Sequence, residues 1–170
     1  MTTIPSKLVL LDFDGVLNDN AHIRGTETKF PGVQIFTLEL GSAMLDPVRC
    51  ARIQRICDVT GAGILLVTGW RRLTQWQNLA EILKGHGITA PVVGAVAGVK
   101  MSGDLRADAS REWLDKNRHV TRYVVIDDDI MAWDGFGKKK PWKDVAVHPT
   151  DGIEDDHVDR AIAILNREAV

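Results

Sequence analysis

Residues 8–18, LVLLDFDGVLN, decide the fold of this chain. The apolar run at 8–11 does not alternate with polar residues, which predicts a parallel strand buried on both faces. Such a strand delivers its last side chains to the carboxyl edge of a sheet, where open α/β folds bind their ligands. Here those side chains are Asp12 and Asp14, which repel each other unless a cation or a proton lies between them. The stretch therefore indicates a metal-assisted carboxylate site, with a plain acidic turn as the alternative.

The composition fits a single globular domain over residues 1–170, because 45% of the residues are hydrophobic and 26% are charged. A formal net charge of −2 gives no overall attraction to nucleic acid or to an anionic membrane. Cys50 and Cys57 lie in one predicted helix and are expected to be buried free thiols of a reducing compartment. The sequence has no signal-peptide pattern and no apolar run long enough for a bilayer, so we expect a cytoplasmic protein.

Strands and helices alternate along the rest of the chain. We interpret the irregular segment 19–45 as a flap or hairpin, with a short strand over 33–40. The next helix begins at the N-cap Asp46 and ends at Gly61, and its predicted inward residues are Val48, Ile53, Ile56 and Cys57. Further strands are predicted at 64–67, 91–96, 123–126 and 144–147, and further helices at 73–85, at 105–117 and from Glu154. This order predicts a three-layer α/β fold with a doubly wound parallel sheet.

Polar side chains follow the strand at 64–67. Thr68 and Gly69 stand at its carboxyl end, where a hydroxyl, a glycine and a helix start form a suitable phosphate cradle, because helix N-termini bind anions. Arg71 adds positive charge at the same edge of the sheet. The alternative is that Thr68 is a helix N-cap and nothing more.

The strand at 123–126 runs directly into Asp127, Asp128 and Asp129. Three adjacent carboxylates after a buried strand are electrostatically costly without a counter-ion. Magnesium prefers hard oxygen ligands and needs only a couple of carboxylates together with water and a phosphate oxygen. If the first strand is central, the strand ends at Asp12, Thr68 and Asp127 meet around one crevice.

These residues resemble the motifs of the haloacid dehalogenase (HAD) superfamily. The first motif, two aspartates around one residue before Gly-Val, stands at 12–16, and the second, a hydroxyl residue after a strand, is Thr68. The fourth, an acidic pair after a strand, is Asp127 with Asp128. The third motif normally supplies a lysine, and here the chain departs from the pattern. We assign its role to one of three cations, with Arg106 placed best and Arg111 and Lys100 as alternates.

A narrower resemblance is to the HAD domain of Swiss-Army-knife RNA repair proteins. It rests on LDFDGVLN, the Trp70-Arg71 and Trp113-Leu114 pairs, VVIDDD, and TDGI before the last helix. Polynucleotide 3'-phosphatases share the general plan. The resemblance implies a magnesium-dependent phosphomonoester hydrolase whose substrate is a phosphorylated small molecule or a nucleic-acid end, with no membrane and no obligate protein partner indicated.

The resemblance also implies roles for the individual residues. Asp12 is expected to be the nucleophile that forms an aspartyl-phosphate, and Asp14 the general acid and base. Magnesium is expected to be held by Asp12, the backbone carbonyl of Asp14, Asp127 and Asp128. The residues expected to bind the phosphate are Thr68, Gly69, Arg106 and Arg71.

Two other functions compete with hydrolysis. Trp133, Phe136 and the lysines at 138–140 resemble a nucleic-acid contact surface, so the chain is alternatively a catalytically inactive HAD-fold module that binds nucleic acid. A signalling receiver domain also uses an aspartate and magnesium. Its acidic pair follows the first strand and its acceptor the third, whereas here an acidic pair follows the fourth strand, which disfavours that function.

Overall fold

The computed structural model of the chain describes residues 3–29, 38–96, 106–129, 133, 146–147 and 149–167. Its described residues contain a five-stranded, all-parallel sheet with the strand order β3-β2-β1-β4-β5. The strands are β1 (Lys7–Leu11), β2 (Gly63–Leu66), β3 (Val92–Ala95), β4 (Arg122–Ile126) and β5 (Ala146–Val147). The predicted doubly wound α/β sheet is thereby confirmed, with the first strand at its centre.

The central strand β1 is buried as its unalternating sequence predicts. Its last residue, Leu11, pairs with Leu66 of β2 on one side and with Ile126 of β4 on the other. Residues 8–11 expose no side-chain surface, because helices cover both faces of the sheet. The strand therefore ends with Asp12 between the ends of its two neighbours.

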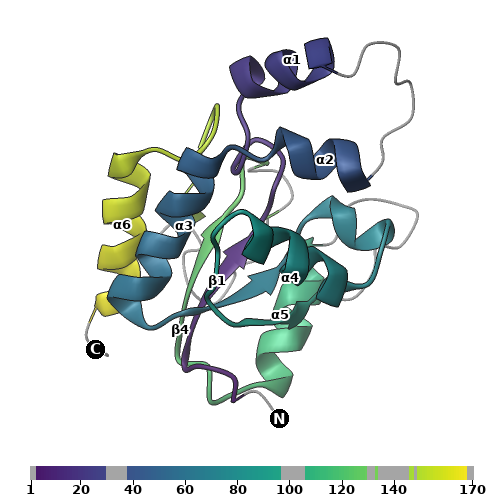
Figure 1. Ribbon diagram of the computed structural model, residues 1–170. Helices are drawn as coiled ribbons and strands as arrows, with labels where there is room; N and C mark the ends of the chain where they lie inside the picture. Colours follow the sequence, from purple (N-terminus) through teal and green to yellow (C-terminus); the bar gives the residue numbers. More distant parts are fainter. Residues whose placement is uncertain are drawn as a thin grey trace.

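Helices form the two outer layers of the fold. They are α1 (Asn20–Lys29), α2 (Leu38–Met44), α3 (Pro47–Thr60), the 3-10 helix η1 (Gly69–Arg72), α4 (Trp76–Gly85), α5 (Arg106–Lys116) and α6 (Asp155–Asn166). Ile53 of α3, Leu83 of α4 and Leu165 of α6 belong to the core on one face. Ala107 of α5 belongs to the core on the other face. Figure 1 shows α3 and α6 side by side along the sheet, which completes the predicted three layers.

Helix α3 follows its sequence signals at both ends. The side chain of the N-cap Asp46 accepts from the N–H of Val48 at 2.8 Å, and Gly61 ends the helix at φ 70°. The predicted inward position of Val48 is wrong, because its side chain is 59% exposed. At 3.6 residues per turn, Val48 lies on the side of the helix opposite Cys57. Cys50 and Cys57 are free and buried, and burial raises the pKa of each thiol to about 12.

The segment 19–45 is helical where the structure describes it. Residues 38–40, predicted as the end of a strand, begin α2, because an alternation this short fits a helix as well as a strand. Residues 33–37 of the predicted strand lie outside the described part. Figure 1 places α1 and α2 beyond the end of the sheet toward which β1 points. In the described part of the chain, every helix is too short or too polar to cross a membrane.

Candidate active site

The candidate active site lies where the three central strands end. The N–H of Asp12 donates to the carbonyl of Ile126 at 3.0 Å, and the N–H of Val67 donates to the carbonyl of Leu11 at 3.0 Å. These two hydrogen bonds continue the parallel ladders one residue beyond the strands. As a result, the polar residues that follow β1, β2 and β4 gather at one edge of the sheet, as the sequence predicts.

Three carboxylates from two of these strand ends form an acidic cluster, Asp12, Asp127 and Asp128. Each offers one oxygen, and the three oxygens lie within 4.8 Å of one another. Asp12 and Asp127 are buried, with 2% and 0% of their surface exposed, whereas Asp128 is exposed. The cluster is thus open to solvent on one side and enclosed by protein on the other.

Arg106, the first residue of α5, reaches into the acidic cluster. Its Nη1 donates to Oδ2 of Asp12 at 2.7 Å and to Oδ2 of Asp127 at 2.7 Å. A single guanidinium nitrogen therefore bridges the two buried carboxylates. The structure describes one of the other two candidates for the third motif. Arg111 pairs with Asp108 on its own helix at 2.7 Å, and Lys100 lies outside the described residues.

The acidic cluster carries more negative charge than Arg106 neutralises. Burial and the neighbouring Asp127 raise the pKa of Asp12 to about 7, although Arg106 opposes the shift. Burial and Asp127 also raise the pKa of Asp128. Asp127 itself is well supplied with donors, because its Oδ1 accepts from the N–H of Asp129 at 2.9 Å and its Oδ2 from Nε1 of Trp133 at 2.8 Å.

The acidic cluster has the chemistry of a site for a hard divalent cation. Oδ1 of Asp12 is buried and has no hydrogen-bond partner among the described residues. A buried carboxylate oxygen without a donor is costly, and a cation held by the three carboxylates removes that cost. Asp128 is pressed against the loop after β1, where a Cβ on Gly15 would lie 2.3 Å from its Oδ2. The residues present therefore fit magnesium.

Asp14 makes different contacts from the acidic cluster. Its Oδ2 accepts from Nε1 of Trp70 at 2.9 Å, and its Oδ1 accepts a longer bond from Nδ2 of Asn18 at 3.4 Å. Trp70 is buried and packs edge-on against Phe13, with ring centroids 5.1 Å apart. Two indoles thus hold the site's acids, since Trp133 binds Asp127 in the same manner. Sequence reasoning missed both contacts, because the spacing of the residues along the chain carries no sign of them.

The predicted phosphate cradle lies beside Asp12 at the end of β2. Thr68 is fully buried and caps η1, its Oγ1 accepting from the N–H of Trp70 at 3.3 Å. Gly69 is the first residue of η1. The guanidinium of Arg71 turns back to the strand end, where Nη1 donates to the carbonyl of Val67 at 2.7 Å and to that of Thr68. The N-cap role of Thr68 is confirmed, and phosphate binding by these residues stays a prediction.

The prediction of a nucleic-acid surface after β4 is wrong for Trp133, the first of its aromatic residues. Trp133 is fully buried in the core with its indole N–H on Asp127, so it is not available to stack on a base. A tryptophan near lysines in the sequence is compatible with a buried position as well as with an exposed one. Here the hydrogen bond to Asp127 holds Trp133 in the core. Phe136 and residues 138–140 lie outside the described part of the chain.

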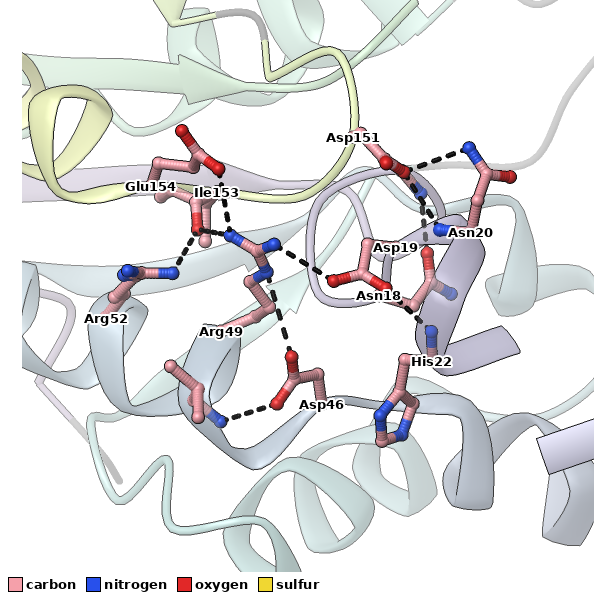
Figure 2. A network of polar contacts seen from close by, with 12 residues as sticks. Asn18, Asp19, Asn20, His22, Asp46, Arg49, Arg52, Asp151, Ile153 and Glu154 are labelled. Atoms are coloured by element: carbon pink, nitrogen blue, oxygen red, sulfur yellow. Dashed lines mark hydrogen bonds and ion pairs between the residues drawn. The ribbon is translucent and has the colours of Figure 1, made fainter. Parts of the chain in front are cut away.

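A polar network joins the loop after β1 to two other elements, as Figure 2 shows. Arg49 of α3 is at its centre, where Nη2 donates to Oδ2 of Asp19 at 2.9 Å and Nη1 to the carbonyl of Ile153 at 2.7 Å. The N–H of His22 and the guanidinium of Arg49 lower the pKa of Asp19. The network is half-buried at its centre, where the side chains of Arg49 and Asp19 are 12% and 16% exposed, and it fixes the loop that follows Asp14.

The segment TDGI before α6 takes part in the same network. Asp151 accepts from the backbone and the side chain of Asn20 at 2.9 and 3.0 Å, at the start of α1. The N–H of Gly152 donates to the carbonyl of Gly15 at 2.9 Å. Gly152 has φ +85°, and a Cβ there would lie 2.7 Å from Nε of Arg49. The glycine is therefore required by both its backbone conformation and its packing.

The sequence was compared with protein families, curated proteins and solved structures. A family model described as the HAD domain in Swiss Army Knife RNA repair proteins matches residues 8–158, which include the acidic cluster, Asp14, Thr68 and Arg106. No curated protein and no solved structure matches the sequence.

Proposed function

Since this chain belongs to the family of HAD domains in Swiss Army Knife RNA repair proteins, we propose that it is a magnesium-dependent phosphomonoester hydrolase. Its substrates are nucleotides or nucleic-acid ends that carry a 3'-phosphate. The observation that carries the proposal is the convergence of Asp12, Asp127 and Asp128 with Arg106 at the carboxyl edge of the sheet. A carboxylate beside ligands for a cation is suited to attack on phosphate, because the cation offsets the repulsion between the two anions.

Asp12 is the proposed nucleophile. One of its carboxylate oxygens attacks phosphorus, a P–O bond to Asp12 forms, and the bond to the leaving oxygen breaks with its electron pair on that oxygen. Water then attacks the phosphorus of the aspartyl-phosphate, which releases inorganic phosphate and restores the carboxylate. Arg106 orients Asp12 through its hydrogen bond at 2.7 Å, and its positive charge stabilises the transferring group.

Asp14 is the proposed general acid and base. As a carboxylic acid it gives its proton to the leaving oxygen, and as a carboxylate it takes a proton from the attacking water. The indole N–H of Trp70 holds one oxygen of Asp14 at 2.9 Å and so limits the orientations of the carboxyl group. Thr68, Gly69 and Arg71 bind the phosphate oxygens at the end of β2.

Asp12, Asp127, Asp128 and the backbone carbonyl of Asp14 would hold the magnesium ion. When bound, it supplies positive charge that offsets the repulsion between the carboxylate and the phosphate oxygens. Oδ1 of Asp12, buried without a donor among the described residues, supports this assignment.

Replacement of the nucleophile tests the proposal. Asp12→Asn keeps the size of the side chain and is expected to abolish hydrolysis of an aryl phosphate in the presence of magnesium, since an amide oxygen does not form the acyl-phosphate. Phosphate release is the measurement, and Asp108→Asn, an exposed change on α5, is the matched control. Turnover by Asp12→Asn equal to that of the native chain would overturn the assignment.

The alternative is a catalytically inactive HAD-fold module that binds nucleic acid. The burial of Trp133 removes one of the aromatic residues that motivate it. Two observations together would favour this alternative. The protein would bind oligonucleotides with an affinity that falls as the salt concentration rises, and it would hydrolyse neither an aryl phosphate nor a 3'-phosphorylated oligonucleotide.

A further inference from the structure

A groove of about 640 Å³ lies beside the phosphate cradle, over η1, the start of α4 and the end of β3. Its lining includes Arg71, Arg72, Gln75, Trp76, Gln77 and Val96. This volume is within the range of small-ligand sites, which is roughly 300–1,000 Å³. It is separate from the acidic cluster, and the mechanism above uses only Arg71 at its edge.

The groove continues the line of strand ends outward from the nucleophile. The N–H of Val96 donates to the carbonyl of Leu66 at 3.0 Å, so the floor of the groove lies one strand beyond Thr68 and two beyond Asp12. Two strand spacings are about 10 Å. A ligand whose phosphate lies at Asp12 would therefore reach the floor of the groove by extending about 10 Å along the strand ends.

The groove lining combines three kinds of recognition chemistry. The indole of Trp76 is half-buried and packs against the core, which leaves part of its surface at the groove. Gln75 and Gln77 are exposed amides that donate and accept hydrogen bonds, and Arg71 and Arg72 carry positive charge. No acidic residue is among those of the described structure that line the groove.

We propose that this groove binds the terminal nucleoside of a single-stranded nucleic acid whose 3'-phosphate lies at Asp12. The base stacks on Trp76, the two glutamines bind its edges, and Arg72 binds the phosphodiester behind it. A phosphorylated sugar or a small aliphatic phosphate offers no flat ring for the indole and no second anionic group for Arg72. This inference rests on the proposed function, and it narrows the substrate to the end of a polynucleotide.

Equilibrium binding of short single-stranded oligonucleotides tests the groove without depending on catalysis. One probe carries a 3'-phosphate on an intact terminal nucleotide, and the second is identical except that its terminal nucleotide lacks the base. The native chain is expected to bind the intact probe about tenfold more tightly, since stacking of one base on an aromatic side chain contributes a factor of this size. Equal affinity for the two probes would overturn the proposal.

Two variants locate the binding in the groove. Trp76→Leu removes the stacking surface, and Gln77→Glu places a negative charge at an exposed position of the groove, where it repels the phosphodiester. Both are expected to weaken binding of the intact probe about tenfold. Lys84→Gln, exposed on the same helix outside the groove, shifts the net charge equally and is the matched control. If Gln77→Glu binds the intact probe as tightly as Lys84→Gln, the groove is not the site.

Hydrolysis of a generic aryl phosphate separates this proposal from the previous one. The two groove variants are expected to hydrolyse it at the native rate, because an aryl phosphate does not extend into the groove. If the native chain hydrolyses no phosphomonoester, the proposed function fails, whereas the binding comparison still decides the groove. If the aryl phosphate is hydrolysed but the base makes no difference to binding, only the groove proposal fails.

Discussion

Arg106 and Arg49 each contact aspartates, but they differ in how completely the carboxylate oxygens of those aspartates are hydrogen-bonded. One nitrogen of Arg106 donates hydrogen bonds to two buried carboxylates, Asp12 and Asp127. Oδ1 of Asp12 has no hydrogen-bond partner among the described residues. Arg49 divides its donors between Oδ2 of Asp19 and the carbonyl of Ile153, as Figure 2 shows. The pKa of Asp12 is raised to about 7, whereas the pKa of Asp19 is lowered.

The opposite pKa shifts distinguish a site for chemistry from a site for stability. Around Arg49 the backbone and the guanidinium supply donors to the carboxylate, so the charged form is favoured and the network stabilises the fold. Around Arg106 the negative charge exceeds the positive charge, so the acidic cluster favours an added cation or proton. The comparison predicts that changes at Arg106 act mainly on activity and changes at Arg49 mainly on stability.

The largest expected effect is on catalysis by Arg106→Met. Loss of the charge that orients Asp12 and stabilises the transferring phosphate is expected to lower kcat/KM about 10²–10³-fold, which is about 3–4 kcal/mol. Steady-state hydrolysis of an aryl phosphate at saturating magnesium measures it. Arg111→Met is the control and is expected to keep native activity, because Arg111 is a partly exposed residue of the same helix that pairs with Asp108.

Arg106→Lys sharpens this prediction. Because a single nitrogen of Arg106 makes both contacts at 2.7 Å, a lysine ammonium has the chemistry to make the same pair. We expect Arg106→Lys to retain more activity than Arg106→Met. An equal loss in both variants would mean that the second guanidinium nitrogen matters and that Arg106 does not fill the role of the usual lysine.

Arg49→Met is expected to lower the free energy of unfolding by about 2 kcal/mol, because it leaves the partly buried carboxylate of Asp19 without its charged donor. Ile153 keeps a donor from Arg52 at 3.0 Å, which limits the loss. Denaturant unfolding measures the change. Arg55→Met removes only exposed ion pairs and is expected to change stability by no more than about 0.5 kcal/mol. Equal effects of the two variants would contradict a stabilising role for the Arg49 network.

The sheet and the acidic cluster could be predicted from the sequence because both follow from local patterns. An apolar run that ends in acids marks a buried strand and its carboxyl edge, as at Asp12 and Asp127. The contact of Arg106 with the acidic cluster also agrees with its position at the start of a helix. In each case the residues that carry the signal lie within a few positions of the element that they define.

What the sequence did not predict depends on contacts between distant segments. The hydrogen bond from Trp70 to Asp14 and the one from Arg49 to Ile153 join residues far apart in the chain, and no periodicity encodes them. The helical form of residues 38–40 was missed because so short an alternation does not distinguish a helix from a strand. The burial of Trp133 was missed because its partner, Asp127, was assigned to the metal alone.

Magnesium is expected to stabilise the chain through the acidic cluster, and more at about pH 8 than at about pH 5.5. The folded-state pKa of Asp12, about 7, exceeds its ordinary value of 3.8, so its contribution to stability is fully present below the lower value. It is lost as the pH rises through about 7, where the ionised carboxylate becomes a metal ligand. Thermal unfolding is measured at one fixed magnesium concentration, ten times the dissociation constant at about pH 8, where it is expected to report about 1.4 kcal/mol of stabilisation, and less at about pH 5.5. Asp128→Asn is expected to reduce it, and stabilisation that is the same at both pH values would contradict the role of Asp12.

The smallest expected effect is that of Trp70→Phe, which removes the indole N–H from Asp14 and keeps a ring to pack against Phe13. A lost hydrogen bond of about 1 kcal/mol corresponds to a fall of about fivefold in kcat/KM. If Trp70 acts by holding Asp14 as the general acid, the fall is larger for an alkyl phosphate, whose leaving oxygen needs a proton, than for an aryl phosphate. The ratio of the two rates is therefore the measurement, since a general loss of structure lowers both rates equally. If Trp70→Phe leaves the ratio of the alkyl to the aryl phosphate rate unchanged, Trp70 has a structural role, as Arg49 has. Catalysis would then depend on Arg106 and the acidic cluster without a contribution from Trp70.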